Sequence, residues 1–333
     1  LANALAELGH EVHIVYSMDC YYLKKGNMTP KGIYINNENV ILHPIKSPSS
    51  VIAPIAGHTF GDYFPLSNKI LQTIKNINAD IIHHHNISGF GPFILKAKAD
   101  KVIYTAHDYW LVCQTYSRLK NNKSPCIYPQ NCAICSILCM KPPQIWRYIT
   151  NKRIQIDNID TIIAPSKFFR NELIRLGISI QIEVIPNFVN VDKSKKNRYF
   201  KYPYLLFVGR LDFEKGITNL IESFLEISKK TDLHLVIVGD GNLKEKVNDQ
   251  SKKSQGKIHC LGYVKSNILS NLYQYAMAVV IPSIFDENCP LVALEAITLG
   301  TPIIGSNHSG FPEIIDATKG GILIDSNNAE VLQ

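Results

Sequence analysis

The sequence has no apolar run long enough to cross a membrane and no dense run of basic residues. A membrane-spanning helix needs about 20 consecutive apolar residues, so the first absence argues against such a helix within these residues. The chain has 333 residues, of which 46% are hydrophobic, and this is enough to bury two cores. We therefore expect a soluble protein of two domains.

Signatures of nucleic-acid binding are also missing. The sequence shows neither zinc-finger spacing on a helix nor an aromatic RNA-binding strand motif. The formal net charge is +7 and the pI is about 8.8, but the lysines are scattered. We expect no nucleic-acid partner. The positive charge suits anionic substrates or surfaces, or it reflects only compositional bias.

Both halves of the sequence alternate strand and helix patterns, which is typical of parallel sheets covered by helices. The expected strands are 11–16, 81–84, 102–105, 161–164 and 182–185 in the first half, and 204–208, 233–238, 258–264 and 278–281 in the second. The lysine-rich stretch 191–202 lacks periodicity and is the expected linker. The domains would then be 1–190 and 203–333.

The segment after an apolar strand ending at Ile281 carries the strongest functional signal. A polar loop delivers Glu287 at the strand's carboxyl end, and Pro290 begins a helix that Gly300 ends. Glu295 is the only charged residue on that helix, and burying a carboxylate without a hydrogen-bonding partner is costly. We expect both glutamates to line one ligand cleft. The alternative is that both are ordinary solvated charges.

A second segment joins a glycine turn to two cations. Gly209 and Arg210 follow the strand 204–208, and Lys215 precedes an expected helix at 217–228. Phosphate groups bind favourably at helix amino ends flanked by cations, so this arrangement suits a diphosphate. Taken singly, Arg210 also fits an ordinary salt bridge and Lys215 a solvated loop residue.

Together the two segments resemble the signature of glycosyltransferase family 4, whose members have the α/β GT-B fold of two Rossmann-like domains facing a central cleft. The resemblance implies that Arg210 and Lys215, after the Gly209 turn, neutralise the diphosphate of a nucleotide-sugar donor. It implies that Glu287 contacts the transferred sugar and that Glu295 holds the ribose hydroxyls. It also implies retention of configuration through same-face attack, with no cofactor required for catalysis.

Further pieces of the family pattern follow in order along the chain. One resembles the strand end and loop that frame the nucleotide base, with a plain tight turn as the alternative. Another is Glu-Asn-Cys-Pro, where many members have Glu-Gly-Phe-Gly, and its proline removes one backbone donor. The expected donor-binding residues at these two places are Gly262, Tyr263, Val264, Asn288, Cys289 and Leu291.

Other parts of the family pattern are missing. Residues 1–8 look like a first helix already under way and ended by Gly9, with no preceding strand and no glycine-rich loop. The sequence stops at Gln333, whereas family members usually continue through further helices. We therefore expect a GT-B fold that is truncated at both ends.

A histidine is the strongest candidate site residue in the first half. His107 follows a buried strand, and ligands of such sheets bind at strand carboxyl ends. The resemblance places His107 at a hydroxyl of the donor sugar, with a structural role as the alternative. His83, His84 and His85 cannot all meet one metal, because neighbouring side chains on a strand point to opposite faces. His85 remains a candidate cleft residue.

Five of the eight cysteines crowd the segment 113–139. They are Cys113, Cys126, Cys132, Cys135 and Cys139. One Cys-x-x-Cys pair has metal-ligand spacing, and a long polar segment would gain order from a structural zinc or iron–sulfur site. Disulfides and reduced thiols are the alternatives. A subset of family 4 resembles this chain in carrying cysteines after a His-Asp-x-Trp element.

Basic and aromatic residues occur together between 141 and 153, including Trp146, Arg147 and Tyr148, with Lys152 and Arg153 beyond them. Such a mixture can seat a helix on an anionic membrane, and an ordinary amphipathic surface helix is the alternative.

The sequence thus predicts a retaining hexosyltransferase of cell-envelope polysaccharide biosynthesis. It would move a sugar from a nucleotide-diphosphate sugar to a hydroxyl of a glycan or lipid-linked acceptor. We expect it in the cytoplasm, with peripheral contact at the inner face of the membrane. A nucleotide-sugar epimerase of the same fold and a non-catalytic nucleotide-sugar-binding fragment are the alternatives.

Overall fold

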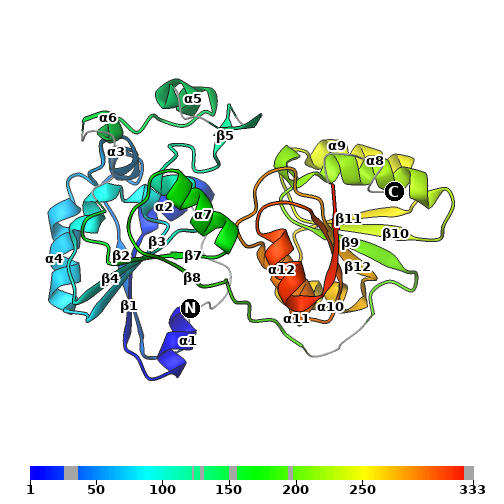
Figure 1. The fold of residues 1–333 in the computed structure, drawn as a ribbon, viewed down its shortest axis with the longest axis horizontal. Coiled ribbons are helices and arrows are strands. Elements are labelled where there is room, and N and C mark those ends of the chain that lie inside the picture. The colour runs from blue at the N-terminus through cyan, green and yellow to red at the C-terminus, as the bar shows by residue number, and fades with distance from the viewer. Residues whose placement is uncertain (26–36, 122–123, 128–130, 150–155, 194–197, 326–333) are drawn as a thin grey trace. The chain divides into compact units, whose positions relative to one another are not determined.

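The chain folds into two compact units (Figure 1). The computed structural model describes residues 1–25, 37–121, 124–127, 131–149, 156–193 and 198–325. The N-terminal unit comprises Leu1–Ala164 and Leu173–Glu183, and the C-terminal unit comprises Pro165–Glu172 and Val184–Gln333. Part of the expected linker, residues 194–197, lies outside the described residues.

The N-terminal unit is built on a four-stranded sheet in the order β3-β4-β7-β8. Its strands are β3 Ile81–His85, β4 Lys101–Thr105, β7 Thr161–Ala164 and β8 Ile182–Val184. The β3–β4 and β4–β7 pairs are parallel, so their carboxyl ends share one edge. Val102, Tyr104 and Ile162 are buried in this sheet, as the apolar pattern of the strands predicts.

A separate parallel pair joins β1 Val12–Ser17 to β2 Val40–Ile45. The sequence predicted the first of these strands and missed the second. Pro44 lies inside β2, and Ile41 and Leu42 of the same strand are exposed. Proline normally argues against a strand, so this edge strand had no clear signal in the sequence.

Helices and short segments complete the N-terminal unit. The α-helices are α1 Ala2–Glu7, α2 Met18–Lys25, α3 Ile52–Phe60, α4 Ser67–Ile77, α5 Cys132–Leu138, α6 Trp146–Ile149 and α7 Lys167–Arg175, the last shared between the units. The 3-10 helices are η1 Ile87–Gly89, η2 Pro92–Lys96 and η3 Tyr109–Leu111. A small antiparallel hairpin pairs β5 Leu119–Lys120 with β6 Ser124–Pro125.

The C-terminal unit has a six-stranded sheet in the order β11-β10-β9-β12-β13-β14 (Figure 1). Its strands are β9 Tyr204–Val208, β10 His234–Val238, β11 Ile258–Gly262, β12 Ala278–Ile281, β13 Ile303–Ser306 and β14 Gly321–Ile324, and the pairs are parallel. The chain starts at β9, builds outward on one side and then continues on the other. This reversal between β9 and β12 is the topological switch point of a doubly wound sheet.

Helices cover both faces of this sheet because successive strand residues point to opposite sides. Leu206 joins a core cluster on one face, whereas Phe207, the next residue, joins the cluster on the other. The helices are η4 Phe213–Lys215, α8 Ile217–Ser228, α9 Lys244–Lys253, α10 Ser266–Tyr275, α11 Leu291–Thr298 and α12 Phe311–Thr318.

Several expected boundaries are confirmed in this unit. β9, β12 and α8 begin and end where the sequence predicted, and Gly300 has a left-handed φ of +80° after α11. Pro290 is the N-cap of α11 rather than its first helical residue. Among the described residues, no helix combines the length and the apolar character that a membrane span requires.

Candidate functional site

Two loops meet at the carboxyl edge of the C-terminal sheet, one after β9 and one after β12. The first carries Arg210 and Lys215, and the second carries Glu287. Ligands of doubly wound sheets bind at this switch point, because neighbouring loops diverge there and leave backbone and side-chain groups accessible. The sheet order therefore brings together residues that are more than seventy positions apart in the sequence.

An ion pair between Lys215 Nζ and Glu287 Oε1 joins the two loops. The Ser283 hydroxyl donates to the same carboxylate oxygen at 2.8 Å, and the backbone N–H of Ile284 donates to the Glu214 carbonyl at 2.9 Å. The two charged side chains are 25% and 17% exposed, so water screens them less than a surface pair. The sequence indicated a ligand-facing role for each residue but not their mutual pairing.

Two glycines allow these loops to approach their neighbours closely. Gly216 has a φ of +68°, and a Cβ atom there would lie 1.9 Å from the carbonyl oxygen of Pro282. A Cβ atom at Gly310 would lie 2.3 Å from the Asn288 carbonyl oxygen and 2.9 Å from that of Glu287. Only glycine fits such contacts, so the backbone itself fixes the loop that carries Glu287.

Arg210 is held by two acidic residues of its own loop. Its guanidinium donates to Asp212 Oδ2 at 2.6 Å and to Glu214 Oε1 at 2.8 Å, and the side chain is 65% exposed. Such exposed bonds are readily exchanged for phosphate oxygens. The N–H of Gly209, in contrast, donates to the Val238 carbonyl at 3.0 Å, so its amide serves the fold.

Glu295 lies on α11 and has a protein partner. Its Oε2 accepts a hydrogen bond of 2.7 Å from the Tyr273 hydroxyl on α10. Tyr273 is 1% exposed, and burial followed by the neighbouring Glu295 carboxylate raises its pKa. A carboxylate on this apolar helix was expected to need a hydrogen-bonding partner. Tyr273 is that partner, and it fixes one carboxylate oxygen of Glu295.

The remaining residues near this edge differ in accessibility. Cys289 is buried, its carbonyl accepts from Asn187 Nδ2 at 3.2 Å, and burial raises the pKa of its thiol. Leu291, the first residue of α11, is half exposed, and Asn288 lies between Glu287 and Cys289 in the loop.

The expected base-framing residues follow β11. Tyr263 is 85% exposed, Val264 packs against the core cluster beneath it, and Gly262 has a left-handed φ of +64°. The exposed ring beside a tight turn offers a flat apolar surface on which a nucleobase can stack.

The histidine candidate lies in the N-terminal unit. His107 follows β4, and its Nε2 is 2.9 Å from Nδ1 of His85 at the carboxyl end of β3, with the rings stacked. Burial lowers the pKa of His107, while the Asp108 carboxylate opposes this shift. The pKa of His85 falls to about 3 through burial and then the neighbouring His83 and His107. Both imidazoles are therefore neutral near pH 7, which suits hydrogen bonding to a hydroxyl.

The three consecutive histidines divide between two faces as predicted. The rings of His83 and His85 are in contact in a tilted arrangement with centroids 4.0 Å apart, whereas His84 is 5% exposed on the opposite side of the strand. Asp108 accepts from the Trp110 N–H at 2.9 Å and so caps η3.

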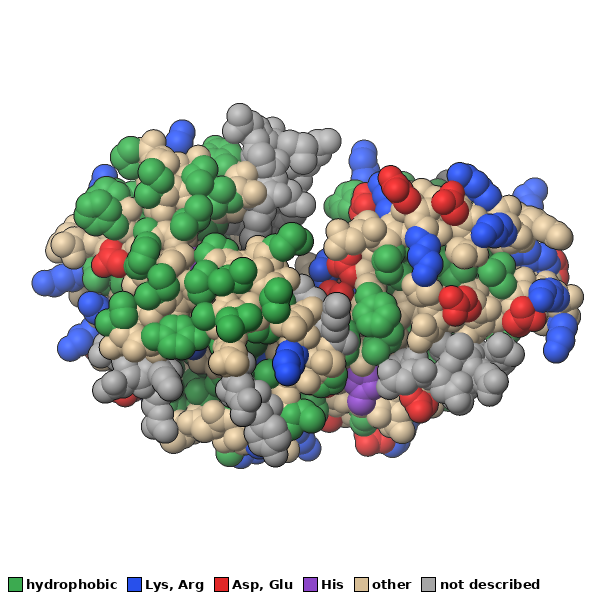
Figure 2. All heavy atoms as spheres, turned by 90° about the horizontal axis from the view of Figure 1, so that it is seen from above, with side chains coloured by type: hydrophobic (Ala, Val, Ile, Leu, Met, Phe, Trp, Pro, Cys, Tyr) green, Lys and Arg blue, Asp and Glu red, His purple; other side chains and the backbone are tan. Residues whose placement is uncertain are grey.

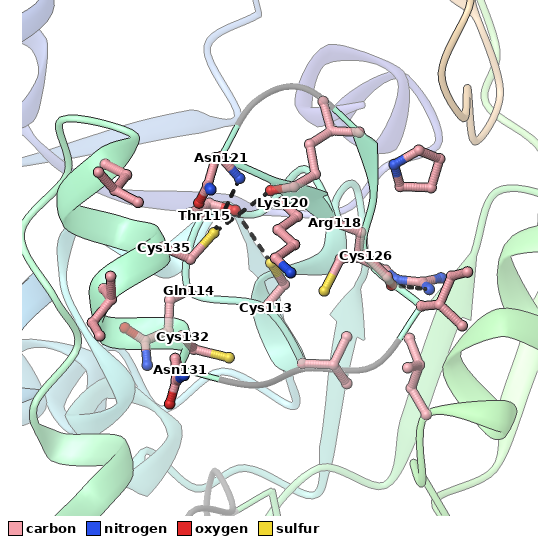
Figure 3. A pocket seen from close by; sticks show the side chains of 17 residues that line it. Cys113, Gln114, Thr115, Arg118, Lys120, Asn121, Cys126, Asn131, Cys132 and Cys135 are labelled. Atoms are coloured by element: carbon pink, nitrogen blue, oxygen red, sulfur yellow. Dashed lines mark hydrogen bonds between the residues drawn. The ribbon is translucent and has the colours of Figure 1, made fainter.

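The cysteines all lie within the described part of the chain, and the structure joins none of them in a disulfide. Four of the five expected metal ligands, Cys113, Cys126, Cys132 and Cys135, line one cavity of about 490 Å³ (Figure 3). Cys139, the fifth, is buried and is not among the residues that line this cavity. Among the described residues, no three His, Cys, Asp or Glu side chains converge closely enough to hold a metal ion as they stand.

Two residues of the expected membrane-facing helix point inward. Trp146 and Arg147 are 4% and 7% exposed, and the guanidinium donates to the backbone carbonyls of Trp110 and Leu111. The expectation that they present a basic, aromatic surface is therefore wrong. Buried carbonyls need donors, and this arginine supplies them. Lys152 and Arg153 lie outside the described residues.

One polar contact had no signal in the sequence. The Glu313 carboxylate accepts from the backbone N–H groups of Lys167 and Phe168, at 2.8 and 2.6 Å, within the C-terminal unit. These amides are the first of α7, so the carboxylate caps that helix. A contact across 145 positions cannot be read from local pattern.

Two family profiles cover the chain. Glycosyltransferase Family 4 matches residues 1–193, and Glycosyl transferases group 1 matches residues 189–333. An uncharacterized glycosyltransferase of Methanocaldococcus jannaschii is 38% identical over 128 residues, which are 38% of this chain and 33% of that protein. The Alpha-monoglucosyldiacylglycerol synthase of Acholeplasma laidlawii is 24% identical over 351 residues, covering 98% of this chain and 80% of that protein.

Solved structures resemble the whole chain. Sucrose-phosphate synthase from Thermosynechococcus elongatus superposes with a TM-score of 0.69 at 18% identity, covering 99% of this chain and 80% of that one. Anabaena HepE in complex with UDP gives a TM-score of 0.60 at 16% identity, covering 88% and 74%. With the parallel sheets described above, these likenesses show the expected α/β GT-B fold of two Rossmann-like domains.

Proposed function

The chain belongs to Glycosyltransferase Family 4, and from this we propose that it moves a hexose from a nucleotide-diphosphate sugar to an acceptor hydroxyl with retention of configuration. The observation that supports this proposal is the Lys215–Glu287 ion pair at the switch point between β9 and β12. It places a cation suited to phosphate beside a carboxylate suited to sugar hydroxyls.

The departing diphosphate needs positive charge as the glycosidic bond breaks. Lys215 and Arg210 supply it by exchanging their present carboxylate partners for phosphate oxygens. Glu287, once released by Lys215, accepts hydrogen bonds from the transferred sugar. Since two protein cations take the electrostatic role, turnover does not depend on added Mg²⁺ or Mn²⁺.

The rest of the proposed donor site follows the same edge of the C-terminal unit. Glu295, oriented by Tyr273, accepts hydrogen bonds from the ribose hydroxyls. Gly262, Tyr263 and Val264 frame the base. The amide of Cys289 lies in the loop that also presents Asn288, and the amide of Leu291 is the first of α11. In the N-terminal unit, neutral His107 hydrogen-bonds a hydroxyl of the transferred sugar.

We propose UDP as the donor nucleotide, since HepE, which shares the fold, binds UDP and, in another structure, UDP with glucose. The acceptor is a glycan or a lipid-linked saccharide. The names of two relatives support this class: one is the diacylglycerol glycolipid synthase, and the other is a lipopolysaccharide N-acetylglucosaminetransferase of Salmonella typhimurium.

The test is a thermal-shift and turnover screen with UDP-, GDP- and ADP-sugars on the wild type and on Lys215→Ala. We expect stabilisation and nucleotide release with one donor, and about a 100-fold loss of turnover in the variant, as for removal of one charge-stabilising donor. Lys257→Ala is the matched control, because Lys257 is also ion-paired and similarly exposed but precedes β11 at the opposite edge of the sheet. Equal losses in both variants would contradict the assignment.

The products decide between this proposal and its alternatives. Transfer with retention gives a product whose anomeric proton coupling in NMR matches that of the donor. An epimerase would convert the sugar without acceptor, and the comparisons do not favour it. A binding fragment would be stabilised by the donor without releasing nucleotide.

We also propose peripheral contact with the cytoplasmic face of a membrane, through an apolar surface of the N-terminal unit. Its exposed residues are Ile52, Ile55 and Phe60 on α3, Ile134, Ile137 and Leu138 on α5, and Met140, Tyr148 and Ile149 on or near α6. Figure 2 shows apolar side chains dense on this face of the unit. Exposed apolar patches of this kind mark interaction sites.

Vesicle co-sedimentation tests this contact. Wild-type protein should sediment with vesicles of phosphatidylcholine and phosphatidylglycerol, and Ile137→Asp should reduce the bound fraction severalfold, because it places a charge in the apolar surface. Ile322→Asp is the control, since Ile322 is equally exposed but lies on β14 of the other unit. Unchanged sedimentation of Ile137→Asp would refute the proposal.

A further inference from the structure

The cavity in the N-terminal unit is surrounded by four thiols. Figure 3 shows the sulfur atoms of Cys113, Cys126, Cys132 and Cys135 around one space. Cys132 and Cys135 come from α5, Cys126 follows the β5–β6 hairpin, and Cys113 follows η3. Three separate parts of the chain thus contribute thiols to the same place.

Local geometry explains how the thiols reach this cavity. Cys132 and Cys135 are three positions apart on α5, so they lie on the same helix face. The hairpin pairs Leu119 with Pro125, which returns the chain so that Cys126 lies beside the cavity. The backbone N–H of Cys126 also donates to the Arg118 carbonyl at 2.7 Å.

Two of these thiols have hydrogen-bond donors close to their sulfur atoms. The backbone N–H of Asn121 donates to the Cys135 sulfur at 3.4 Å, and Thr115 Oγ1 lies 3.3 Å from the Cys113 sulfur. N–H and O–H groups of this kind orient ligands from behind and stabilise their charge. Arg118 and Lys120 line the same cavity and would offset the two negative charges of a four-thiolate site with a divalent cation.

The segment that carries the thiols buries few apolar side chains. Among the described residues of 113–139, the buried apolar side chains are those of Leu119 and Cys139. α5 has seven residues, and a helix this short is not stable by itself. Four non-glycine residues nearby have left-handed φ values between +52° and +69°, which is unfavourable for most L-residues; they are Tyr116, Arg118, Asn121 and Asn131.

We propose that Cys113, Cys126, Cys132 and Cys135 bind one structural Zn²⁺ in a tetrahedral four-thiolate site. The thiols as they stand do not yet converge, so metal binding draws them together and releases their protons, and the free energy of binding stabilises the segment. The site lies outside the proposed donor-binding residues, and its role is to hold α5, the β5–β6 hairpin and the chain after η3 together. Cys139 is left out of the proposed site, because it is buried and does not line the cavity.

Elemental analysis of the purified full chain is the direct test. We expect about one zinc per chain, and less than about one fifth of that in Cys132→Ser or Cys135→Ser. Cys139→Ser and Cys260→Ser are the matched controls and should keep the metal. Replacement of zinc by Co²⁺ should give the intense visible bands of tetrahedral thiolate coordination.

A second measurement covers the case in which the ligand variants fail to fold. Titration of the wild type with a mercurial in the presence of a zinc-sensitive dye should release about one zinc as about four thiols react. The proposal is overturned if the folded protein binds neither zinc nor Co²⁺ when the metal is supplied in excess. It is also overturned if iron with the absorption of an iron–sulfur cluster is found, or if mass spectrometry shows disulfides among the four cysteines.

Discussion

Lys215 and Glu287 form an ion pair, so neither charge is left unpaired although both side chains are partly buried. Arg210 is held in the same way by Asp212 and Glu214. A donor diphosphate would therefore have to exchange partners with these cations, and this exchange favours a dianionic ligand over a neutral one.

Tyr273→Phe tests the role of Glu295. The substitution removes one hydroxyl from a fully buried ring and leaves the packing intact. A hydrogen bond to a charged group contributes about 1.5–3 kcal/mol, so loss of the orientation of Glu295 should raise the KM for the donor about tenfold, with a smaller change in kcat. A KM that stays at the wild-type value would separate Glu295 from donor binding.

His84 should make stability depend on pH. Burial lowers its folded-state pKa to about 4, from about 6.5 in the unfolded chain. Between these values the unfolded chain binds a proton that the folded chain does not, so stability is lost as pH falls from 7 toward 4. The loss attributable to His84 is at most about 3 kcal/mol. Denaturant unfolding at pH 7 and pH 4.5 should show a smaller difference for His84→Leu, whereas His10→Ala, an exposed control, keeps the wild-type dependence.

At the scale of elements, the candidate site depends on how closely the loop after β9 approaches the strand end of β12. The Gly216 backbone is so close to Pro282 that no side chain fits between them. Because Gly216 is also the N-cap of α8, the same glycine fixes the start of that helix and the position of Lys215. This backbone contact therefore determines both where α8 starts and where Lys215 lies.

Gly216→Ala measures this contact. Alanine there faces both the left-handed φ and the Pro282 carbonyl, so we expect a loss of about 3 kcal/mol or more in unfolding free energy. Gly256→Ala is the control, because Gly256 also has a left-handed φ of +83° but has open space where the alanine methyl group would lie. Its loss should be about 1 kcal/mol. Equal losses of unfolding free energy in the two variants would show that the close approach of Gly216 to Pro282 does not affect stability.

At the scale of the whole molecule, the chain forms two compact units that each bury apolar residues, and the proposed nucleotide contacts lie in the C-terminal unit. Units of this kind can respond to a ligand separately, so we expect the two units to unfold in separate transitions. The nucleotide should stabilise its own unit first.

Hydrogen exchange with UDP tests this expectation. At about 100 times Kd, UDP should stabilise the bound state by about 2.7 kcal/mol and slow exchange in peptides covering 209–216 and 282–291. Peptides covering β3 and β4 of the N-terminal unit should keep their rates, because UDP lacks the sugar proposed to contact His107. Protection confined to the N-terminal unit would contradict the assignment of the nucleotide site.

The sequence by itself determined the α/β class and most strand positions, and it suggested the residues of the candidate donor site. It could do so because these signals are local: apolar runs mark β9 and β12, Gly300 marks a helix end, and Glu287 and Lys215 stand at fixed offsets from strand ends. The strand β2 was not predicted, because Pro44 and two exposed apolar residues interrupt the alternation that marks a strand.

Only the tertiary structure decided which of these residues meet. The sheet order brings Lys215 to Glu287. Helix packing gives Glu295 its tyrosine and turns Arg147 inward to backbone carbonyls. The tertiary structure decides all three. It also separates four cavity-lining thiols from Cys139. These outcomes depend on contacts between segments distant in the chain, whose geometry is set by strand order and packing rather than by local pattern.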